Sequence, residues 1–291
     1  MNFLPTVSVI VAVFNAEKTI EDCLQSLLKL NYPREKLELI LVDNGSTDKT
    51  RTLMERHNGA FHIVKEEKRG PAAARNRGLR KAKGEVIAFT DSDCVVDDNW
   101  LLHIVSPLQD LQVGAVGGRI LSKGPDAIQR FYEQVSDHER AIRKFKPPYV
   151  ITMNWASRMS VLSEAGLFDE NLRRGEDVDL SFRMQQSGYS FVFQPDAIIY
   201  HQNEPTLGSL FRKGYLHGYY SVPLLKKHKD YVRSFGHRRI PVRVYRELLS
   251  SAVRVWRKDM RADPAMCRFV FDSGKRIGKA FGSVRFFYLE L

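Results

Sequence analysis

The sequence of 291 residues contains no apolar run as long as a membrane span. A transmembrane helix needs about 20 consecutive apolar residues. The opening stretch MNFLPTVSVIVAVFNAEK is apolar, but no basic segment precedes it, which argues against a secretory signal peptide. We therefore expect a chain without membrane spans that works in the cytoplasm.

Cysteine is also scarce. The three cysteines, Cys23, Cys94 and Cys267, are odd in number and widely spaced. Such a pattern does not build a disulfide framework and is typical of a reducing compartment. The remaining composition, 43% hydrophobic and 27% charged, is that of an ordinary globular protein with a buried core.

Acidic residues are few in the last third of the chain. Residues 201–291 hold 19 Lys and Arg against 7 Asp and Glu, a net of +12, whereas residues 1–200 carry a net of −1. This asymmetry predicts an anionic partner, either nucleic acid or a membrane surface. We find no nucleic-acid recognition motif, and a basic amphipathic stretch with Trp256 is typical of a helix on an anionic membrane. The alternative is that these helices pack on the rest of the protein with solvated charges.

Short apolar strands alternate with helices over the first 110 residues, which predicts an α/β fold with a mainly parallel sheet and helices on both faces. The expected strands are 7–13, 37–42, 61–64 and 85–90, and the expected helices are 18–30, one from about Lys49, 70–84 and 97–108.

The pattern is mixed between residues 111 and 205. Strands are expected at 113–121 and 191–200, and helices at 131–145 and around 178–188. No linker precedes residue 205, so residues 1–205 are predicted to form one folded unit. Residues 206–291 are predicted to be a basic, mainly helical extension, with helices over 206–230 and 242–261.

An acidic pair follows the strand of residues 85–90. Asp91 and Asp93 are separated only by Ser92, and side chains two apart on an extended chain share a face. Two carboxylates placed together repel unless a cation lies between them, and Mg²⁺ or Mn²⁺ prefers such oxygen ligands. The alternative is that one aspartate caps the next helix, although Asp97 and Asp98 are better placed for that.

Two further stretches resemble ligand-binding turns. Asp43 ends a strand and precedes a glycine turn, where it could accept hydrogen bonds from a nucleobase or ribose; a plain turn capped by Thr47 or Asp48 is the alternative. Arg75 lies in a basic segment around a helix start, where phosphate can bind. That segment could equally be a solvated basic helix face.

A second acidic pair, Glu176 and Asp177, opens a predicted helix. Carboxylates in a first turn favour the helix dipole, which is a purely structural role. Alternatively, one of them is a general base that activates an acceptor hydroxyl. His201, at the end of the strand 191–200, is either a third metal ligand or a structural histidine.

Together these segments resemble glycosyltransferase family 2, the inverting nucleotide-sugar transferases with the GT-A fold. The resemblance covers about residues 5–215, and the segments match the family pattern in order. They are VSVIVAVFNAEKTIEDCLQSLL, ELILVDNGSTDKT, RGPAAARNRGL, GEVIAFTDSD, GLFDENLRRGEDVDLSFRMQQSGY and YHQNEP.

The resemblance implies a nucleotide-sugar half at about 1–110, an acceptor half at about 111–205, and a role for each matching residue. The nucleotide would be bound by Ala12, Glu17, Asp43, Arg75, Asp91 and Ser92, and the metal by Asp93, Asp91 and His201. The sugar or acceptor would be bound by Asn154, Trp155 and Arg158. The general base would be Asp177, supported by Glu176.

The resemblance implies metal-dependent inverting transfer of a single sugar, with a UDP-sugar as the expected donor. Processive members carry a Gln-x-x-Arg-Trp motif followed by membrane spans, whereas this chain reads LGSLFRKGYLHGYY there. The basic tail suggests a glycan or lipid-linked acceptor at the inner face of the cell membrane, in cell-envelope synthesis. The alternatives are a catalytically silent scaffold and a sugar-phosphate nucleotidyltransferase, though the loop after the first strand lacks the glycines expected of the latter.

Overall fold

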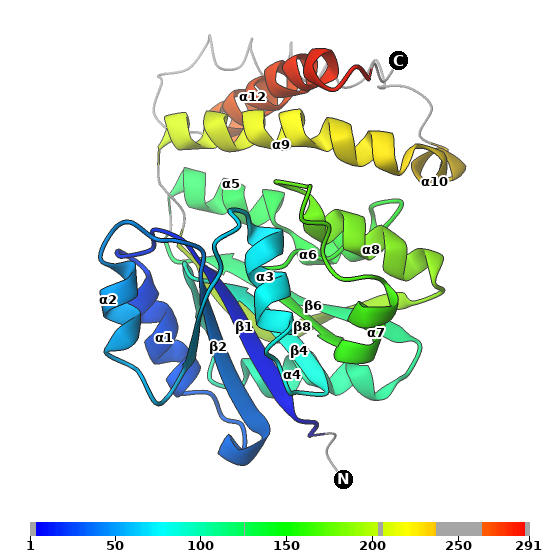
Figure 1. Ribbon diagram of the computed structural model, residues 1–291. Helices are drawn as coiled ribbons and strands as arrows, with labels where there is room; N and C mark the ends of the chain where they lie inside the picture. The colour runs from blue at the N-terminus through cyan, green and yellow to red at the C-terminus, as the bar shows by residue number, and fades with distance from the viewer. Residues whose placement is uncertain (1–3, 125, 203–205, 237–263, 289–291) are drawn as a thin grey trace. The chain divides into compact units, whose positions relative to one another are not determined.

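The computed structural model describes residues 4–124, 126–202, 206–236 and 264–288. The chain divides into two compact units (Figure 1), one of residues 1–121 and 136–202 and one of residues 122–135 and 203–291. The second unit therefore includes residues 122–135, which the sequence analysis assigned to the first 205 residues.

The first unit is built on one eight-stranded sheet with the order β3-β2-β1-β4-β7-β6-β8-β5. The pairs β1–β2, β1–β4 and β2–β3 are parallel, whereas β4–β7, β6–β7 and β5–β8 are antiparallel. The strands are β1 (Val7–Val13), β2 (Leu37–Asp43), β3 (His62–Lys65), β4 (Val86–Asp91), β5 (Cys94–Val96), β6 (Val113–Ser122), β7 (Asn154–Arg158) and β8 (Ser190–His201).

Alternate residues of the central strands enter two cores, one on each face of the sheet. Val9 and Val11 of β1 pack into one core, whereas Ile10 packs into the other. The first core is covered by α1 (Ile20–Leu28), α2 (Thr50–Glu55) and α4 (Trp100–Val105). The second is covered by α3 (Pro71–Leu79), α6 (His138–Arg143), α7 (Met159–Glu164) and α8 (Glu176–Gln186). These buried layers explain why the central strands read as continuous apolar runs.

The predicted α/β fold is confirmed, and the structure corrects several local predictions. The helix predicted over 70–84 ends at Leu79, and the one predicted from Asp97 begins at Trp100. The single helix predicted over 131–145 is two helices, because Asp137 caps α6 by accepting from the N–H of Arg140. The short strand β5 was not predicted.

The second unit is helical. It contains α5 (Ala127–Val135), α9 (Leu207–Lys227), α10 (Lys229–Ser234) and α12 (Pro264–Arg285). Phe131 of α5 and Phe271 of α12 pack edge to face at 5.6 Å, in a small core that also includes Leu210 of α9. The helix predicted over 206–230 is confirmed, whereas the one predicted over 242–261, with Trp256, lies outside the described residues.

Helices α9 and α12 pack with their backbones in direct contact. A Cβ atom at Gly218 would overlap the backbone oxygen of Lys275, and one at Gly278 would overlap that of Tyr215. Only glycine allows such an approach. None of the described helices is long and apolar enough to cross a membrane.

Candidate active site

The carboxyl ends of the parallel strands bring the predicted nucleotide-side residues to one edge of the sheet. In the β-ladder Ala12 lies opposite Asp91 and Val13 lies opposite Asp43. Ligands of open α/β sheets bind beyond these strand ends. Ala12, Asp43 and Asp91 are therefore together where the sequence placed them.

Asp43 and Glu17 tie two loops together at this edge. The buried Asp43 carboxylate accepts from the N–H of Ser46 at 2.9 Å, and the exposed Glu17 carboxylate accepts from the N–H of Lys49 at 3.1 Å. Asn15, whose φ is +48°, accepts from the N–H of Thr47 at 2.8 Å. These bonds hold the two turns in a fixed shape. The second oxygen of Asp43 lies 3.8 Å from the guanidinium of Arg51.

An aromatic residue that was not predicted from the sequence lies at the same edge. Phe14 directly follows β1 and is 51% exposed, and the guanidinium of Arg69 lies 4.3 Å from the centre of its ring. Arg69 also donates to the backbone oxygen of Asn44 at 2.8 Å. The signal in the sequence is an aromatic residue directly after an apolar strand, at a position where the chain is expected to turn toward solvent.

Arg75 joins carboxylates from two distant parts of the first unit. One guanidinium nitrogen donates to Glu176 at 2.6 Å and another donates to Asp91 at 2.9 Å. Arg75 and Glu176 are buried, and Asp91 is half-buried. Burial alone would lower the pKa of Arg75, but the carboxylates of Asp91, Glu176 and Asp177 raise it, so the arginine stays charged.

Glu176 and Asp177 are held in the first turn of α8. Gly175, with φ of +79°, makes the turn into the helix, a conformation that glycine adopts without strain. Burial first, and then the charge of Glu176, raise the pKa of Asp177 to about 7, against the opposing effects of Arg75 and of the N–H groups of Val178 and Thr152. Asp177 is thus a carboxylate that exchanges a proton near neutral pH.

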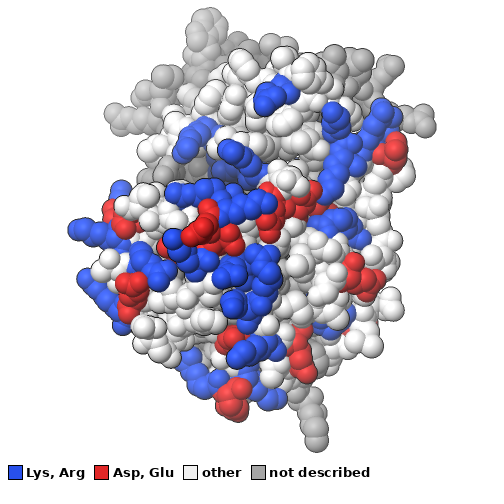
Figure 2. Space-filling view, in the orientation of Figure 1, with Lys and Arg blue, Asp and Glu red and all other residues white. Residues whose placement is uncertain are grey.

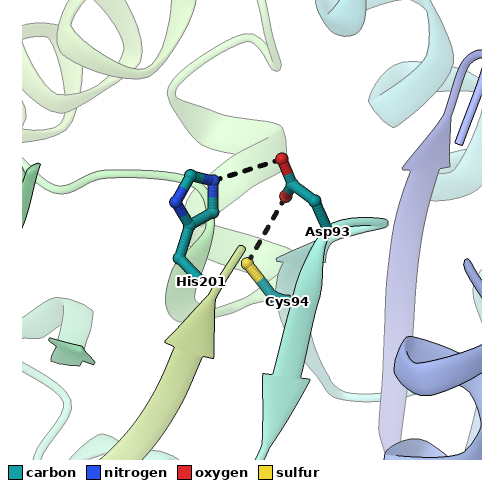
Figure 3. Close-up of side chains that lie close together, drawn as sticks. All are labelled: Asp93, Cys94 and His201. Atoms are coloured by element: carbon teal, nitrogen blue, oxygen red, sulfur yellow. Dashed lines mark hydrogen bonds and ion pairs between the residues drawn. The ribbon is translucent and has the colours of Figure 1, made fainter. Parts of the chain in front are cut away.

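Asp93, Cys94 and His201 form a compact cluster where β5 meets β8 (Figure 3). His201 Nε2 lies 3.2 Å from one carboxylate oxygen of Asp93, and Cys94 Sγ lies 3.7 Å from the other. The three donor atoms lie within 4.8 Å of one another. Asp93 is 40% exposed at its side chain, whereas Cys94 and His201 are buried. The pair of Asp93 and His201 was predicted, but Cys94 was not.

The residues predicted on the acceptor side have different environments. Asn154 is buried; it accepts from Trp100 Nε1 at 2.8 Å and donates to the backbone oxygens of Arg119 and Ala197, each at 2.9 Å. Trp155 is buried against Phe89, and its indole nitrogen has no hydrogen-bond partner among the residues that the structure describes.

Arg158 is not brought to this edge. In the β4–β7 ladder Asn154 lies opposite Thr90, next to Asp91, whereas Arg158 lies opposite Val86 at the other end of the strand. Its guanidinium donates to the backbone oxygens of Leu108, Asp110, Leu111 and Val113. Because β7 runs antiparallel to β4, Arg158 lies far from the carboxyl ends of the parallel strands. Its four hydrogen bonds to backbone oxygens indicate a structural role.

Comparison with known proteins decides the family. The family model described as Glycosyl transferase family 2 matches residues 8–165. Glycosyltransferase AglE of Haloferax volcanii is 33% identical over 217 residues, which cover 72% of this chain and 71% of AglE. The chain belongs to glycosyltransferase family 2. It spans between 43% and 53% of the length of several other curated relatives.

Solved structures agree on the fold of this family 2 enzyme. The mannosyltransferase PcManGT from Pyrobaculum calidifontis, in complex with GDP-Man and Mn²⁺, has a TM-score of 0.66 at 21% identity, covering 96% of this chain and 88% of that one. Residues 1–349 of S. aureus TarS in complex with UDP have a TM-score of 0.55 at 18% identity, covering 98% and 93%. The fold is GT-A, and the protein is a glycosyltransferase.

The family model ends before α8, so it does not include Glu176, Asp177 or His201. The structure nevertheless connects this later segment to the matched one, because Glu176 binds Arg75 and His201 lies beside Asp93. The candidate site is thus assembled from both sides of the boundary at residue 165.

Proposed function

We propose that the protein transfers a single sugar, with inversion, from a nucleotide-diphosphate sugar to an acceptor hydroxyl. The observation that carries the proposal is the cluster in which Arg75 bridges Asp91 and Glu176, next to Asp177 with its raised pKa. In this cluster the charged Arg75, on the proposed donor side, lies near Asp177, whose carboxylate is able to take a proton at neutral pH.

Asp177 is proposed as the general base and Glu176 as its supporting residue. A base works best when its pKa is near the operating pH, and the pKa of Asp177 is about 7. Glu176 is neutralised by Arg75 at 2.6 Å, which fixes the start of α8 and limits the repulsion between the two acids. Inversion follows from a direct displacement in which Asp177 deprotonates the acceptor opposite the leaving diphosphate.

Asp93 and His201, with Asp91 nearby, are proposed to hold Mg²⁺ or Mn²⁺. Their atoms fit, since a carboxylate oxygen and an imidazole nitrogen lie 3.2 Å apart and Asp93 is partly open to solvent. When bound, such an ion neutralises a departing diphosphate as a Lewis acid. PcManGT binds Mn²⁺ with GDP-Man, which supports a divalent ion here.

Ala12, Glu17, Asp43 and Ser92 are proposed to line the nucleotide site, together with Phe14. The exposed ring of Phe14 offers a flat apolar face. The turns of residues 13–17 and 43–50, which hydrogen bonds hold in shape, offer fixed donors and acceptors. Together these features suit a nucleobase. A UDP-sugar is the donor we propose, and TarS in complex with UDP supports that base.

A glycan or lipid-linked acceptor is proposed to enter beside Trp155, whose buried indole N–H lacks a partner within the described part of the chain. Buried donors are rarely left unpaired, so this position favours an acceptor or water when the site is filled. The side-chain amide of Asn154 already accepts one hydrogen bond and donates two within the protein. Asn154 would therefore support the site structurally.

The second unit is proposed to lie on an anionic membrane surface, at the inner face of the cell membrane. Helix α9 contains no acidic residue and α12 contains only Asp272, whereas both contain several Lys and Arg. Figure 2 shows separate basic side chains among uncharged ones on the part that these helices form. Ile277, Phe281 and Val284 of α12 are 44%, 62% and 75% exposed, and their spacing puts them on one face. Apolar side chains among cations are typical of interfacial helices.

The membrane proposal is tested by sedimentation of the full chain with anionic and with neutral vesicles. The double substitution Phe281→Ser and Val284→Ser should lower the fraction bound to anionic vesicles. Leu111→Ser, at a residue of the first unit that is 73% exposed, is the matched control and should bind as the unchanged chain does. Equal binding by all three proteins would contradict the proposal.

The transfer proposal is tested first by thermal unfolding with UDP, GDP, TDP and CDP, each with and without Mn²⁺. A ligand that binds only the folded state raises the melting temperature. One diphosphate should stabilise the protein in the presence of Mn²⁺, Asp93→Ala should abolish that shift, and Asp177→Asn should keep it but lose transfer. A protein that neither binds a nucleotide nor transfers a sugar would be the silent scaffold.

A further inference from the structure

A thiol lies within coordinating distance of the proposed metal-binding pair. Cys94 and His201 are directly opposed residues of the antiparallel pair β5–β8, and opposed side chains lie on the same face of a sheet. Asp93 precedes Cys94 in the chain. Figure 3 shows the three side chains turned toward one another.

Two of the separations between donor groups are close to the edges of a tetrahedral zinc site. With zinc–ligand distances of about 2.0–2.1 Å for nitrogen and oxygen and about 2.3 Å for sulfur, ideal edges are about 3.3 Å between nitrogen and oxygen and about 3.6 Å between sulfur and oxygen. Here His201 Nε2 lies 3.2 Å from one carboxylate oxygen of Asp93, Cys94 Sγ lies 3.7 Å from the other, and the three donor atoms lie within 4.8 Å of one another.

The set of donors favours a softer ion than the one proposed for sugar transfer. Mg²⁺ and Mn²⁺ prefer oxygen ligands, whereas thiolate and imidazole together favour Zn²⁺. Three protein ligands with one open position are typical of zinc sites that also bind a small molecule. Here the open side is that of Asp93, which is 40% exposed.

The surroundings keep the cluster in place. The backbone oxygen of Asp93 accepts from the N–H of Gln202 at 2.8 Å, and the amide of Gln202 donates to Asp22 at 2.9 Å. Cys94 has no exposed surface. Cys94 and His201 are fixed on the paired strands β5 and β8, and the contacts of Gln202 hold the turn residue Asp93 beside them, which favours binding without ordering of a loop.

We propose that Asp93, Cys94 and His201 bind Zn²⁺ in a tetrahedral site, and that zinc bound there inhibits the enzyme. The inhibition rests on the proposed function, because both ions would use Asp93 and His201 and only one can occupy them. Zinc binding itself does not depend on it. The protein would then respond to the ratio of zinc to its activating cation.

Binding is tested with Co²⁺, which replaces Zn²⁺ and shows a thiolate-to-cobalt charge-transfer absorption when sulfur is bound. The unchanged protein should show this absorption and lose it when Zn²⁺ is added. Cys94→Ser should lack it, whereas Cys23→Ser and Cys267→Ser, which change the two other buried cysteines, should retain it. Zinc affinity, measured by competition with an indicator, should fall at least tenfold in Cys94→Ser alone. Absence of the absorption from the unchanged protein, or equal zinc affinity in all variants, would overturn the proposal.

Inhibition is tested by titrating Zn²⁺ into the Mn²⁺-loaded enzyme and expressing each rate relative to that variant's own rate without zinc. Zinc should inhibit the unchanged enzyme, excess Mn²⁺ should relieve the inhibition, and Cys94→Ser should need at least tenfold more zinc. If Cys94→Ser is inhibited equally, zinc does not act through this site. If the cobalt absorption is present but no nucleotide binds with Mn²⁺, the zinc site stands and the proposed function fails.

Discussion

The guanidinium of Arg75 and the carboxylate of Glu176 lie 2.6 Å apart although 101 residues separate them in the chain. Both side chains are almost completely buried, at 6% and 8% exposed. Arg75 is also 2.9 Å from Asp91, so one cation connects the end of β4 with the start of α8. Four predictions follow from this and from other contacts of the structure.

Arg75→Ala should destabilise the first unit by about 3–5 kcal/mol, because breaking a buried pair leaves an uncompensated charge at Glu176. Urea unfolding measures this loss. Arg80→Ala is the matched control on the same stretch of chain: Arg80 is 47% exposed and its pairs with Glu66 and Glu170 are 3.5 and 3.6 Å long, so it should cost less than about 1 kcal/mol. Similar losses in the two variants would show that the buried bridge is not a special contact.

The rate of transfer should depend on the ionisation of Asp177. With a pKa of about 7, the carboxylate is largely protonated at pH 6 and cannot accept the acceptor's proton. We expect kcat/KM to rise about tenfold per pH unit below 7 and to level off above it. Steady-state kinetics from pH 5 to 9 measure the profile, and a flat profile would exclude Asp177 as the base.

The same raised pKa predicts an effect on stability. The pKa of Asp177 is about 7 in the folded protein against an ordinary value of 3.8, so between these pH values the folded state binds more protons than the unfolded state. Stability contributed by the protonated form is therefore present below pH 4 and lost as the pH rises through 7. Asp177→Asn should raise the melting temperature relative to the unchanged protein at pH 8, and less or not at all at pH 4. A difference that does not change with pH would contradict the assigned environment.

Gly218→Ala should disturb the pairing of α9 with α12, because the added methyl group would overlap the backbone oxygen of Lys275. Overpacking of this kind costs about 1–3 kcal/mol. Gly208→Ala, in the same helix but with nothing within 4 Å of the added carbon, should be neutral or slightly stabilising. Thermal unfolding followed by circular dichroism compares them, and equal melting temperatures would show that the helices separate at little cost.

The local pattern of the sequence was sufficient for the parallel part of the sheet and for the residues at its edge. Apolar runs ending in Asp43 and Asp91 identify strands and their carboxyl ends, which the register confirms. The local pattern was insufficient to predict β5, because its three residues are too few to show an alternation of apolar and polar side chains.

The local pattern of the sequence did not show the contacts between distant segments, and the pairing of Asp93 with His201 was predicted only through the family resemblance. Nothing near Arg75 shows that Glu176 lies opposite it, or that Cys94 pairs with His201 across two strands. The direction of β7 was equally hidden, and it decides that Asn154 lies level with Thr90 while Arg158 lies at the other end of the strand.

The second unit is assembled from two separate pieces of chain, since α5 joins helices that follow residue 203. Ile128, Phe131 and Tyr132 of α5 are buried in a core with Leu210, Cys267 and Phe271. A chain cut after residue 202 would therefore keep α5 and expose its apolar face to water, where it would promote aggregation. Shortening the protein at its carboxyl end cannot remove the second unit cleanly, so its role must be studied by substitutions in the intact chain.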